Sequence, residues 1–202
     1  MNIQNIVRKY VDMNPHVKNT LRIDLINLSK LSRAIISEKR LDDNDFDAVL
    51  VALRRIKESL KHFSFLKISK LLKETSSRVE NKICVIITDN YIHSETISQI
   101  KRHDPSIIVI EGYSGKTIVT SDRNKEMIVE KMKNHILKVQ DNQIKITLVS
   151  PENLEVIPGV ISHIYSLLSE NGINISETMS CFKDTILIIH ENDLNKALDL
   201  LS

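Results

Sequence analysis

Hydrophobic residues recur every three or four positions over the first seventy residues, which is the spacing of helices with one buried face. This pattern predicts five helices, at residues 3–12, 15–21, about 28–35, 46–56 and 65–72. Asn27 or Ser29 is expected to cap the third of them. Pro15 suits the first turn of a helix, where its missing N–H needs no partner. The region contains no glycine. We therefore expect an all-helical domain over residues 1–72.

Beyond this region, β-branched runs alternate with helical ones. The expected order is strand, helix, strand, strand, helix, at residues 83–88, 93–102, 107–111, 116–120 and 123–137. The same order returns with a strand from Ile144, a helix from Val160 that stops at Asn171-Gly172, strands at 173–182 and 185–190, and a helix to Leu201. The pattern predicts an α+β fold with two successive βαββα segments, 78–140 and 141–202.

Two short segments in the last third point to a family. Pro158-Gly159-Val160 opens the helix, and Gly172-Ile173-Asn174-Ile175 leads into the second strand. Together with the βαββα order, they resemble the ACT domain, a small ferredoxin-like fold that typically senses amino acids. Residues 78–140 repeat the order as a degenerate ACT-like unit, with Asp89-Asn90-Tyr91 in place of Ile157-Pro158-Gly159. The tandem pair is similar to the regulatory region of aspartate kinases.

The chemistry of the Pro158-Gly159 turn fits a free amino acid. A helix start offers backbone N–H groups and a favourable dipole to a carboxylate, and Gly159 allows close approach. Asn174 carries both a donor and an acceptor. The resemblance implies ligand binding between the first-strand loop of one unit and the second strand of its neighbour, through Ile157, Pro158, Gly159, Val160, Asn174 and Ile175. Alternatively, Pro-Gly is an ordinary strand-to-helix turn, and Asn174 hydrogen-bonds that turn.

The helical domain suggests an output. Residues 1–80 contain 16 Lys and Arg against 10 Asp and Glu, whereas the remainder contains 12 against 16. Residues 25–35 and 48–55 are similar to a small helical domain that accompanies ACT repeats in certain prokaryotic proteins. A helix-turn-helix arrangement would make duplex DNA a partner, contacted by Arg54, Arg55, Lys57 and Lys61. Alternatively, Arg54 and Arg55 form surface ion pairs with the acids at 42–47 or with Glu58.

Other motif-like segments lack residues that their chemistry requires. A phosphate-binding loop at Gly112–Thr117 would need glycine at Ile110 and a following helix, so a hairpin turn is expected. A calcium loop from Asp43 would need glycine at Ala48. No histidines have ligand spacing, and both cysteines lie in apolar runs typical of packing. We expect no catalytic residue, metal site or cofactor, and hence no enzyme.

The sequence therefore predicts a cytoplasmic, amino-acid-sensing, allosteric regulatory protein. No run is apolar enough for a membrane span. Exposed strand edges favour side-by-side pairing into a homodimer. The leading hypothesis is a transcriptional regulator, with the ligand in the ACT pair and output through the helical domain. The alternative is a regulatory subunit that does not bind DNA, or an orphan aspartate-kinase-like regulatory region, controlling an enzyme of amino-acid metabolism.

Overall fold

The computed structural model describes residues 2–60 and 65–201, with side chains from residue 67 onward in the second range. The chain divides into two compact units, residues 1–65 and 66–202. None of the helices in the described ranges has both the length and the hydropathy needed to cross a bilayer.

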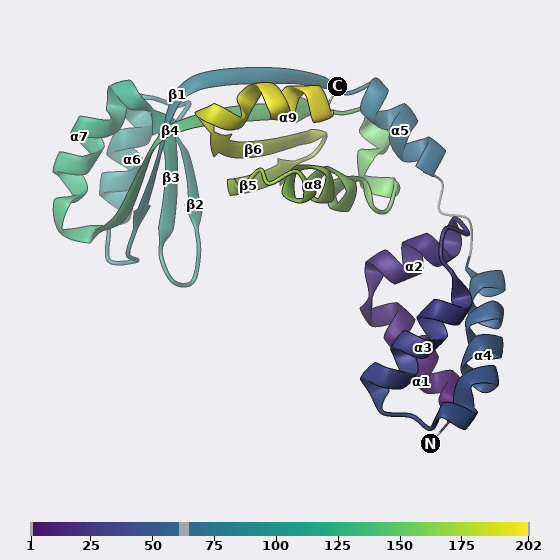
Figure 1. Ribbon diagram of the computed structural model, residues 1–202. Helices are drawn as coiled ribbons and strands as arrows, with labels where there is room; N and C mark the ends of the chain where they lie inside the picture. The colour runs from purple at the N-terminus through teal and green to yellow at the C-terminus, as the bar shows by residue number, and fades with distance from the viewer. Residues whose placement is uncertain (1, 61–64, 202) are drawn as a thin grey trace. The chain divides into compact units, whose positions relative to one another are not determined.

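The first unit is helical, as the periodicity predicts (Figure 1). Its described part contains α1 (Ile3–Met13), α2 (Pro15–Arg22), α3 (Leu28–Lys39) and α4 (Phe46–Ser59), with a 3-10 turn at Asp43–Asp45. The Asn27 side chain accepts a hydrogen bond from the Lys30 N–H at 2.9 Å, so Asn27 rather than Ser29 caps α3. The helices enclose one core, which includes Val7, Leu21, Ile35, Val49 and Leu53.

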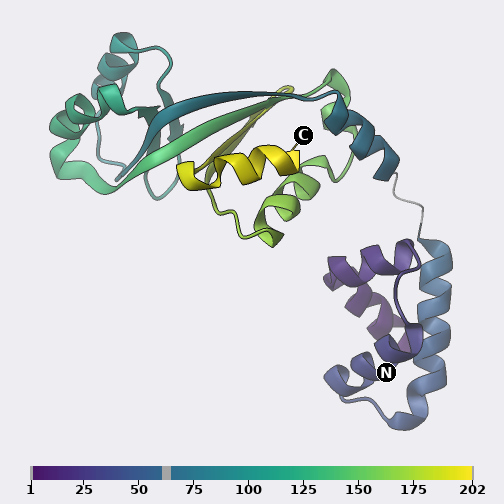
Figure 2. The same cartoon turned by 45° about the horizontal axis from the view of Figure 1, so that its top comes forward.

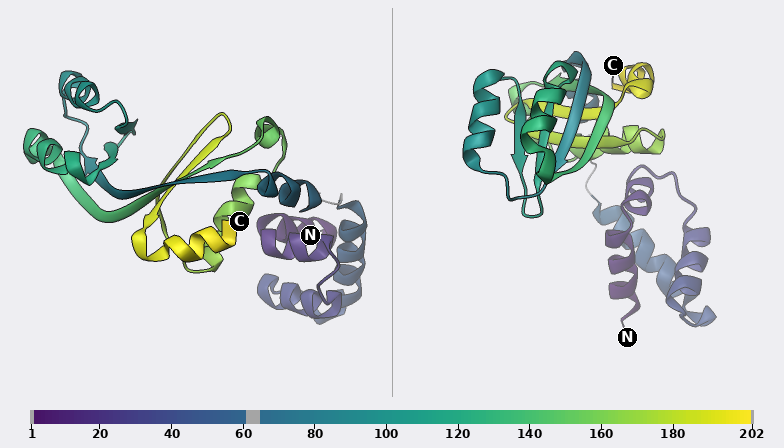
Figure 3. Two further views of the ribbon diagram at one scale, coloured as in Figure 1. Left: turned by 90° about the horizontal axis from the view of Figure 1, so that it is seen from above. Right: turned by 90° about the vertical axis from the view of Figure 1, so that its left-hand side faces the viewer.

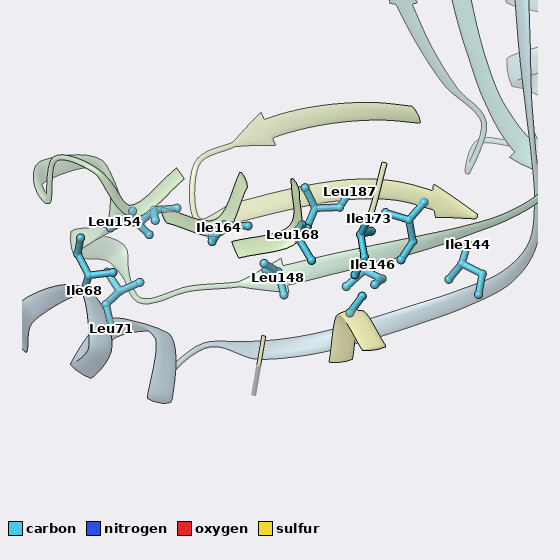
Figure 4. Packing of buried hydrophobic residues seen from close by; sticks show 13 residues of the cluster. Ile68, Leu71, Ile144, Ile146, Leu148, Leu154, Ile164, Leu168, Ile173 and Leu187 are labelled. Atoms are coloured by element: carbon cyan, nitrogen blue, oxygen red, sulfur yellow. The ribbon is translucent and has the colours of Figure 1, made fainter. Parts of the chain in front are cut away.

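Helix α5 (Phe65–Lys73) packs with the second unit. Ile68 and Leu71 are each 2% exposed, and they share a core cluster with Leu154 of that unit (Figure 4). The division between the two units therefore falls after the first residue of α5, not at residue 72 as the helical periodicity led us to expect. Periodicity identifies the apolar face of a helix but not the partner that buries it.

The second unit is built on one antiparallel sheet. Its strands are β1 (Ser76–Thr88), β2 (Ile108–Glu111), β3 (Lys116–Ser121), β4 (Ile136–Val149), β5 (Ile175–Cys181) and β6 (Asp184–His190), in the order β2-β3-β1-β4-β6-β5. The connecting helices are α6 (Ser94–His103), α7 (Asp122–Met132), α8 (Val160–Glu170) and α9 (Leu194–Leu201). The order βαββα thus occurs twice along the chain, within a single continuous sheet, and the α+β class is confirmed.

The two longest strands, β1 and β4, run beside each other from the Ser76–Val149 pair to the Thr88–Ile136 pair (Figure 2). Their register shifts between Glu80 and Ile83, and the nearby Lys82 and Asn142 have positive φ angles of 57° and 56°. Bulges of this kind increase the twist of a sheet. The sheet accordingly bends and curls along these strands (Figure 3).

Two expected elements differ from the structure for the same reason. The helix expected at 123–137 ends at Met132, and Ile136 instead opens β4; β1 begins at Ser76 rather than at residue 83. In both strands the unexpected part pairs with the other long strand. Pairing between distant segments therefore overrides the local pattern here.

Helices cover the sheet through two separate cores. Helices α6 and α7 pack on Cys84, Ile86 and Ile118, whereas α8, α9 and α5 pack on Ile146, Leu148 and Leu187. A further apolar cluster contains Ile83, Val85, Val119 and Ile188. Ile83 and Val85 alternate with Cys84 and therefore face the opposite side of β1. Because the sheet curls, this side is also partly closed.

The β2–β3 connection is the expected hairpin. The Gly112 N–H donates to the Gly115 carbonyl at 2.9 Å. A Cβ on Gly115 would lie 2.3 Å from the Thr88 carbonyl oxygen, so the strand passes too close for any side chain there.

Candidate ligand site beside helix α8

The start of α8 has the backbone geometry that the Pro158-Gly159 turn predicts. Gly159 has φ 91° and ψ −1°, in the left-handed region that disfavours residues with a Cβ. Its carbonyl accepts the His163 N–H at 2.8 Å, and no side chain caps the helix. The N–H groups of the first turn have no intrahelical acceptor, and the helix dipole adds partial positive charge there. This end of α8 is therefore suited to an anion such as a carboxylate.

Two hollows flank this end of α8. The smaller, of about 240 Å³, is lined by three of the predicted residues, Ile157, Gly159 and Val160, and is bordered by Phe182. The larger, a groove of about 750 Å³, is lined by the predicted Asn174 and Ile175. Pro158 is exposed and lines neither. The structure thus places Ile157, Pro158, Gly159 and Val160 at the start of α8, and Asn174 and Ile175 just beyond its other end, so the six residues do not line one cavity.

Ile161 and Ser162 border both hollows. They lie in the first turn of α8, directly after Val160. A molecule held by the N–H groups of this turn would therefore have access to either hollow. We refer to the two hollows as the two arms of the candidate site.

The larger groove is rich in hydroxyl groups that the sequence analysis did not single out. They belong to Ser162, Tyr165, Ser166, Ser169, Ser176 and Thr178. The Tyr165 and Thr178 hydroxyl oxygens are 2.7 Å apart and tie α8 to β5. The spacing of Ser162, Ser166 and Ser169, at i, i+4 and i+7, marks one helix face. The serine spacing could be recognised in the sequence, whereas the position of β5 opposite this helix face could not.

Glu177 supplies the one carboxylate among the described residues that line this groove. It follows a register shift in β5, where the Ser176 hydroxyl donates to the Gln143 side-chain oxygen at 2.8 Å. The Thr117 hydroxyl of β3 lies 3.4 Å from Glu177. The groove therefore adjoins a strand of the first βαββα segment.

Comparison with known proteins agrees with this geometry. Residues 138–202 match the family model of the ACT domain. This part of the chain is an ACT domain. Its match spans nearly all of β4 and every later element, including both hollows. No curated protein matches the chain.

Solved structures share the fold of the larger part of the chain. The structure titled aspartokinase alpha and beta subunits is 13% identical, covers 62% of this chain and 94% of its own, and has a TM-score of 0.53. Aspartate kinase of Clostridium acetobutylicum is 15% identical with a TM-score of 0.54; the match covers 62% of this chain but only 33% of the kinase. A putative C-terminal regulatory domain of aspartate kinase from Porphyromonas gingivalis is 17% identical, covers 63% of this chain and 94% of its own, and has a TM-score of 0.50.

In the first βαββα segment, the loop Asp89-Asn90-Tyr91 occupies the place of Ile157-Pro158-Gly159, and its side chains form hydrogen bonds. The Asp89 carboxylate accepts the Tyr91 N–H at 2.8 Å and lies 3.0 Å from His135 Nδ1. Partial burial raises the pKa of Asp89, but the bonds from Tyr91 and His135 outweigh it and lower this pKa below its usual value. The Asn90 side chain donates to the Tyr113 carbonyl. Asp89 and Asn90 of this loop are therefore already hydrogen-bonded, within the loop and to His135 and Tyr113.

Three of the four proposed DNA contacts lie on the second half of α4. Arg54 and Arg55 are exposed on the second half of α4, and neither forms an ion pair with a residue in the described ranges. Lys57 pairs with Asp24 at 2.5 Å, and Lys61 lies outside the described residues. Bases are read mainly by the N-terminal part of a recognition helix. The first turn of α4 is instead preceded by acids at positions 42, 43 and 45 and contains Asp47.

Cys84, Asp122 and Asp141 place a thiol and two carboxylates within 4.8 Å of one another. Burial, reinforced by Asp141, raises the pKa of Cys84 to about 12. Lys125 already pairs with Asp141 at 2.6 Å. A protonated thiol and a carboxylate that is already paired are poor metal ligands, so we do not put this cluster forward as a metal site.

Proposed function

We propose that this protein is an amino-acid-responsive regulator in which the ACT domain binds the ligand and the helical unit carries the output. The observation that carries the proposal is the uncapped start of α8, which opens onto two hollows inside the matched ACT segment. The fold shared with regulatory parts of aspartate kinases supports a regulatory role. Nothing in the proposal requires catalysis.

The ligand would be held through its carboxylate at the start of α8. The first-turn N–H groups of α8 would receive the carboxylate, with Gly159 allowing close approach. Its side chain would extend into one of the two hollows, the larger of which is lined by Glu177 and Asn174. The hydroxyl groups along α8 and β5 favour a polar side chain in that arm.

The two βαββα segments, 78–140 and 141–202, would act as a pair of ferredoxin-like units that complete each other. Each segment has five of the six elements of a βαββαβ unit. For the first segment, the beginning of β4 supplies the missing strand beside β1; for the second, the beginning of β1 supplies it beside β4. Ligand binding at α8 would then be felt in the first segment through Glu177 and Thr117.

A homodimer is the expected assembly. Strands β2 and β5 are the two edges of the sheet, and each has one side unpaired in the described chain. Such edges favour pairing with a second copy. Static light scattering at micromolar concentration should give twice the chain mass, whereas a monomer at all concentrations would contradict the proposal.

The output is proposed to act on a protein, an enzyme of amino-acid metabolism being the first candidate. The acids around the start of α4 and the Lys57–Asp24 pair argue against reading DNA with that helix. DNA binding remains the second candidate because residues 1–65 carry 12 Lys and Arg against 8 Asp and Glu. Titration of the full chain with duplex DNA at several salt concentrations separates the two. Steep salt dependence would favour DNA.

A thermal-shift panel with the standard amino acids tests the ligand class. A ligand that binds only the folded state raises the melting temperature according to its occupancy. We expect stabilisation by one amino acid or a small related group, in the transition of the sheet unit. If none of them shifts that transition at millimolar concentration, the sensing proposal fails.

A further inference from the structure

A third hollow lies in the helical unit, away from the basic half of α4. It has a volume of about 650 Å³ and lies between the end of α3 and the start of α4. Ile36, Leu41 and Phe46 give it an apolar floor, since they also pack against the helical core. Arg33, Ser37 and Arg40 line it from α3 and its C-cap. We call this hollow the α3–α4 groove.

Arg40 has a backbone conformation that its residue type disfavours. It caps α3 with φ 51° and ψ 47°, in the left-handed region where helix ends usually have glycine or asparagine. The following Leu41 N–H donates to the Ile36 carbonyl at 3.0 Å, so the chain reversal is fixed. The Arg40 side chain is exposed and borders the groove. A strained residue kept at the rim of a hollow is the kind of outlier from which a functional site is inferred.

Arg33 is oriented rather than free to move. Its guanidinium carbon lies 5.6 Å from the centre of the Phe46 ring, within the range of a cation–π contact. In the described part of the chain, neither Arg33 nor Arg40 forms an ion pair, although Asp43 lines the same groove. The groove thus presents two guanidinium groups above an apolar floor, with one carboxylate at its edge.

We propose that the α3–α4 groove binds an acidic peptide segment of a partner protein. An apolar side chain of the segment would enter the hollow, and its carboxylates would pair with Arg33 and Arg40, whose planar forks suit carboxylates. The concave shape and apolar floor fit a side chain, whereas a duplex requires a protruding element that enters its groove. This proposal rests on the helical unit being the output part of the regulator.

Fluorescence anisotropy with the full-length protein tests the proposal. The probe is a labelled nine-residue peptide set with central Leu-Phe, Phe-Leu or Leu-Leu pairs flanked by glutamates, and the control set has glutamines instead. We expect binding of an acidic peptide, and at least ten-fold weaker binding of its glutamine counterpart. Arg33→Gln should weaken binding about ten-fold or more, as loss of a charged hydrogen bond does. Arg8→Gln makes the same change of charge at an exposed position of α1, outside the groove, and should leave peptide affinity unchanged.

Arg40→Gly separates binding from stability. Glycine relieves the left-handed strain, so this variant should melt at a higher temperature than the wild type while binding the acidic peptide at least ten-fold more weakly. Equal affinity of wild type, Arg33→Gln and Arg40→Gly would overturn the proposal, as would the absence of any glutamate-dependent binding. Duplex DNA binding lost in the same two variants would assign the groove to nucleic acid instead. The amino-acid thermal shift, measured in the same variants, shows separately whether the ACT sensor works.

Discussion

Replacing Leu71 with alanine tests whether α5 packs in the core of the sheet unit or of the helical unit. Leu71 is 2% exposed and belongs to the core cluster of the sheet unit, with Ile68, Leu148 and Leu154. The change removes three carbon atoms, for which transfer from water accounts for about 2.4 kcal/mol. The cavity left behind adds to this, so we expect the sheet unit to lose about 3 kcal/mol of unfolding free energy.

Calorimetry and hydrogen exchange together give the size and the place of the effect. Unfolding entropy of about 2.1 cal/mol/K per residue, over a unit of residues 66–202, converts a loss of about 3 kcal/mol into a fall in Tm of about 10 °C. Exchange should accelerate in peptides from β4, α8 and β6, and not in peptides from α1 to α4. Leu53→Ala is the matched control, because Leu53 is fully buried in the helical core, and it should show the reverse pattern. The reasoning is refuted if Leu71→Ala accelerates exchange in α1 to α4 and spares the sheet.

Two further predictions concern single groups in the sheet unit. The Asp104 carboxylate accepts hydrogen bonds from the Ser106 hydroxyl, Asn124, Arg123 and the Ser106 N–H, and these bonds hold its pKa well below the usual range. A carboxylate whose pKa is lowered by folding stabilises the folded state above its unfolded pKa of about 3.9, and this stabilisation is lost as the pH falls through the folded pKa. Asp104→Asn should therefore be less stable than the wild type at pH 7 in urea unfolding, with the gap closing below about pH 4, and a gap that stays constant in acid would count against the account. Cys84 is buried with its pKa raised to about 12, whereas Cys181 is exposed. A thiol reagent should therefore label one thiol of the native protein at pH 8 and two thiols in denaturant. Rapid labelling of both thiols in the native state would be inconsistent with the burial of Cys84.

The sequence was sufficient where local chemistry decides the structure. Three features act on neighbouring backbone groups: the cap of α3, Pro15 at the start of α2 and the turn at Pro158-Gly159. The last two were predicted correctly, and Asn27 was one of the two residues expected to cap α3. The ACT resemblance rested on the same kind of local feature, and the match to residues 138–202 confirms it.

Features that depend on distant segments were not predictable in this way. The beginning of β1 and the beginning of β4 contain many polar residues, and they form strands because they pair with each other. Helix α5 belongs to the sheet unit because it packs on Leu154 and its neighbours, about eighty residues away in the chain. The left-handed Arg40 has no sequence signature, since glycine or asparagine would be expected there.

The candidate site shows the same division. Four of the six predicted residues lie at the start of α8, and Asn174 and Ile175 lie just beyond its other end. The hydroxyl-lined arm and Glu177 became visible only when α8 and β5 were placed side by side. Whether the six residues contact a ligand together stays a prediction, because they line two hollows.

Calorimetric titration of Gly159→Ala with the amino acid found in the thermal-shift panel tests the central claim most directly. The matched control is Gly172→Ala, since Gly172 also has a positive φ, of 77°, with nothing within 4 Å of a Cβ placed there. Both variants carry the backbone strain, but only the first places a methyl group at the start of α8. The account predicts that Gly172→Ala binds with wild-type Kd and that Gly159→Ala binds at least ten-fold more weakly. Equal affinity in all three proteins would place the ligand elsewhere and contradict the account.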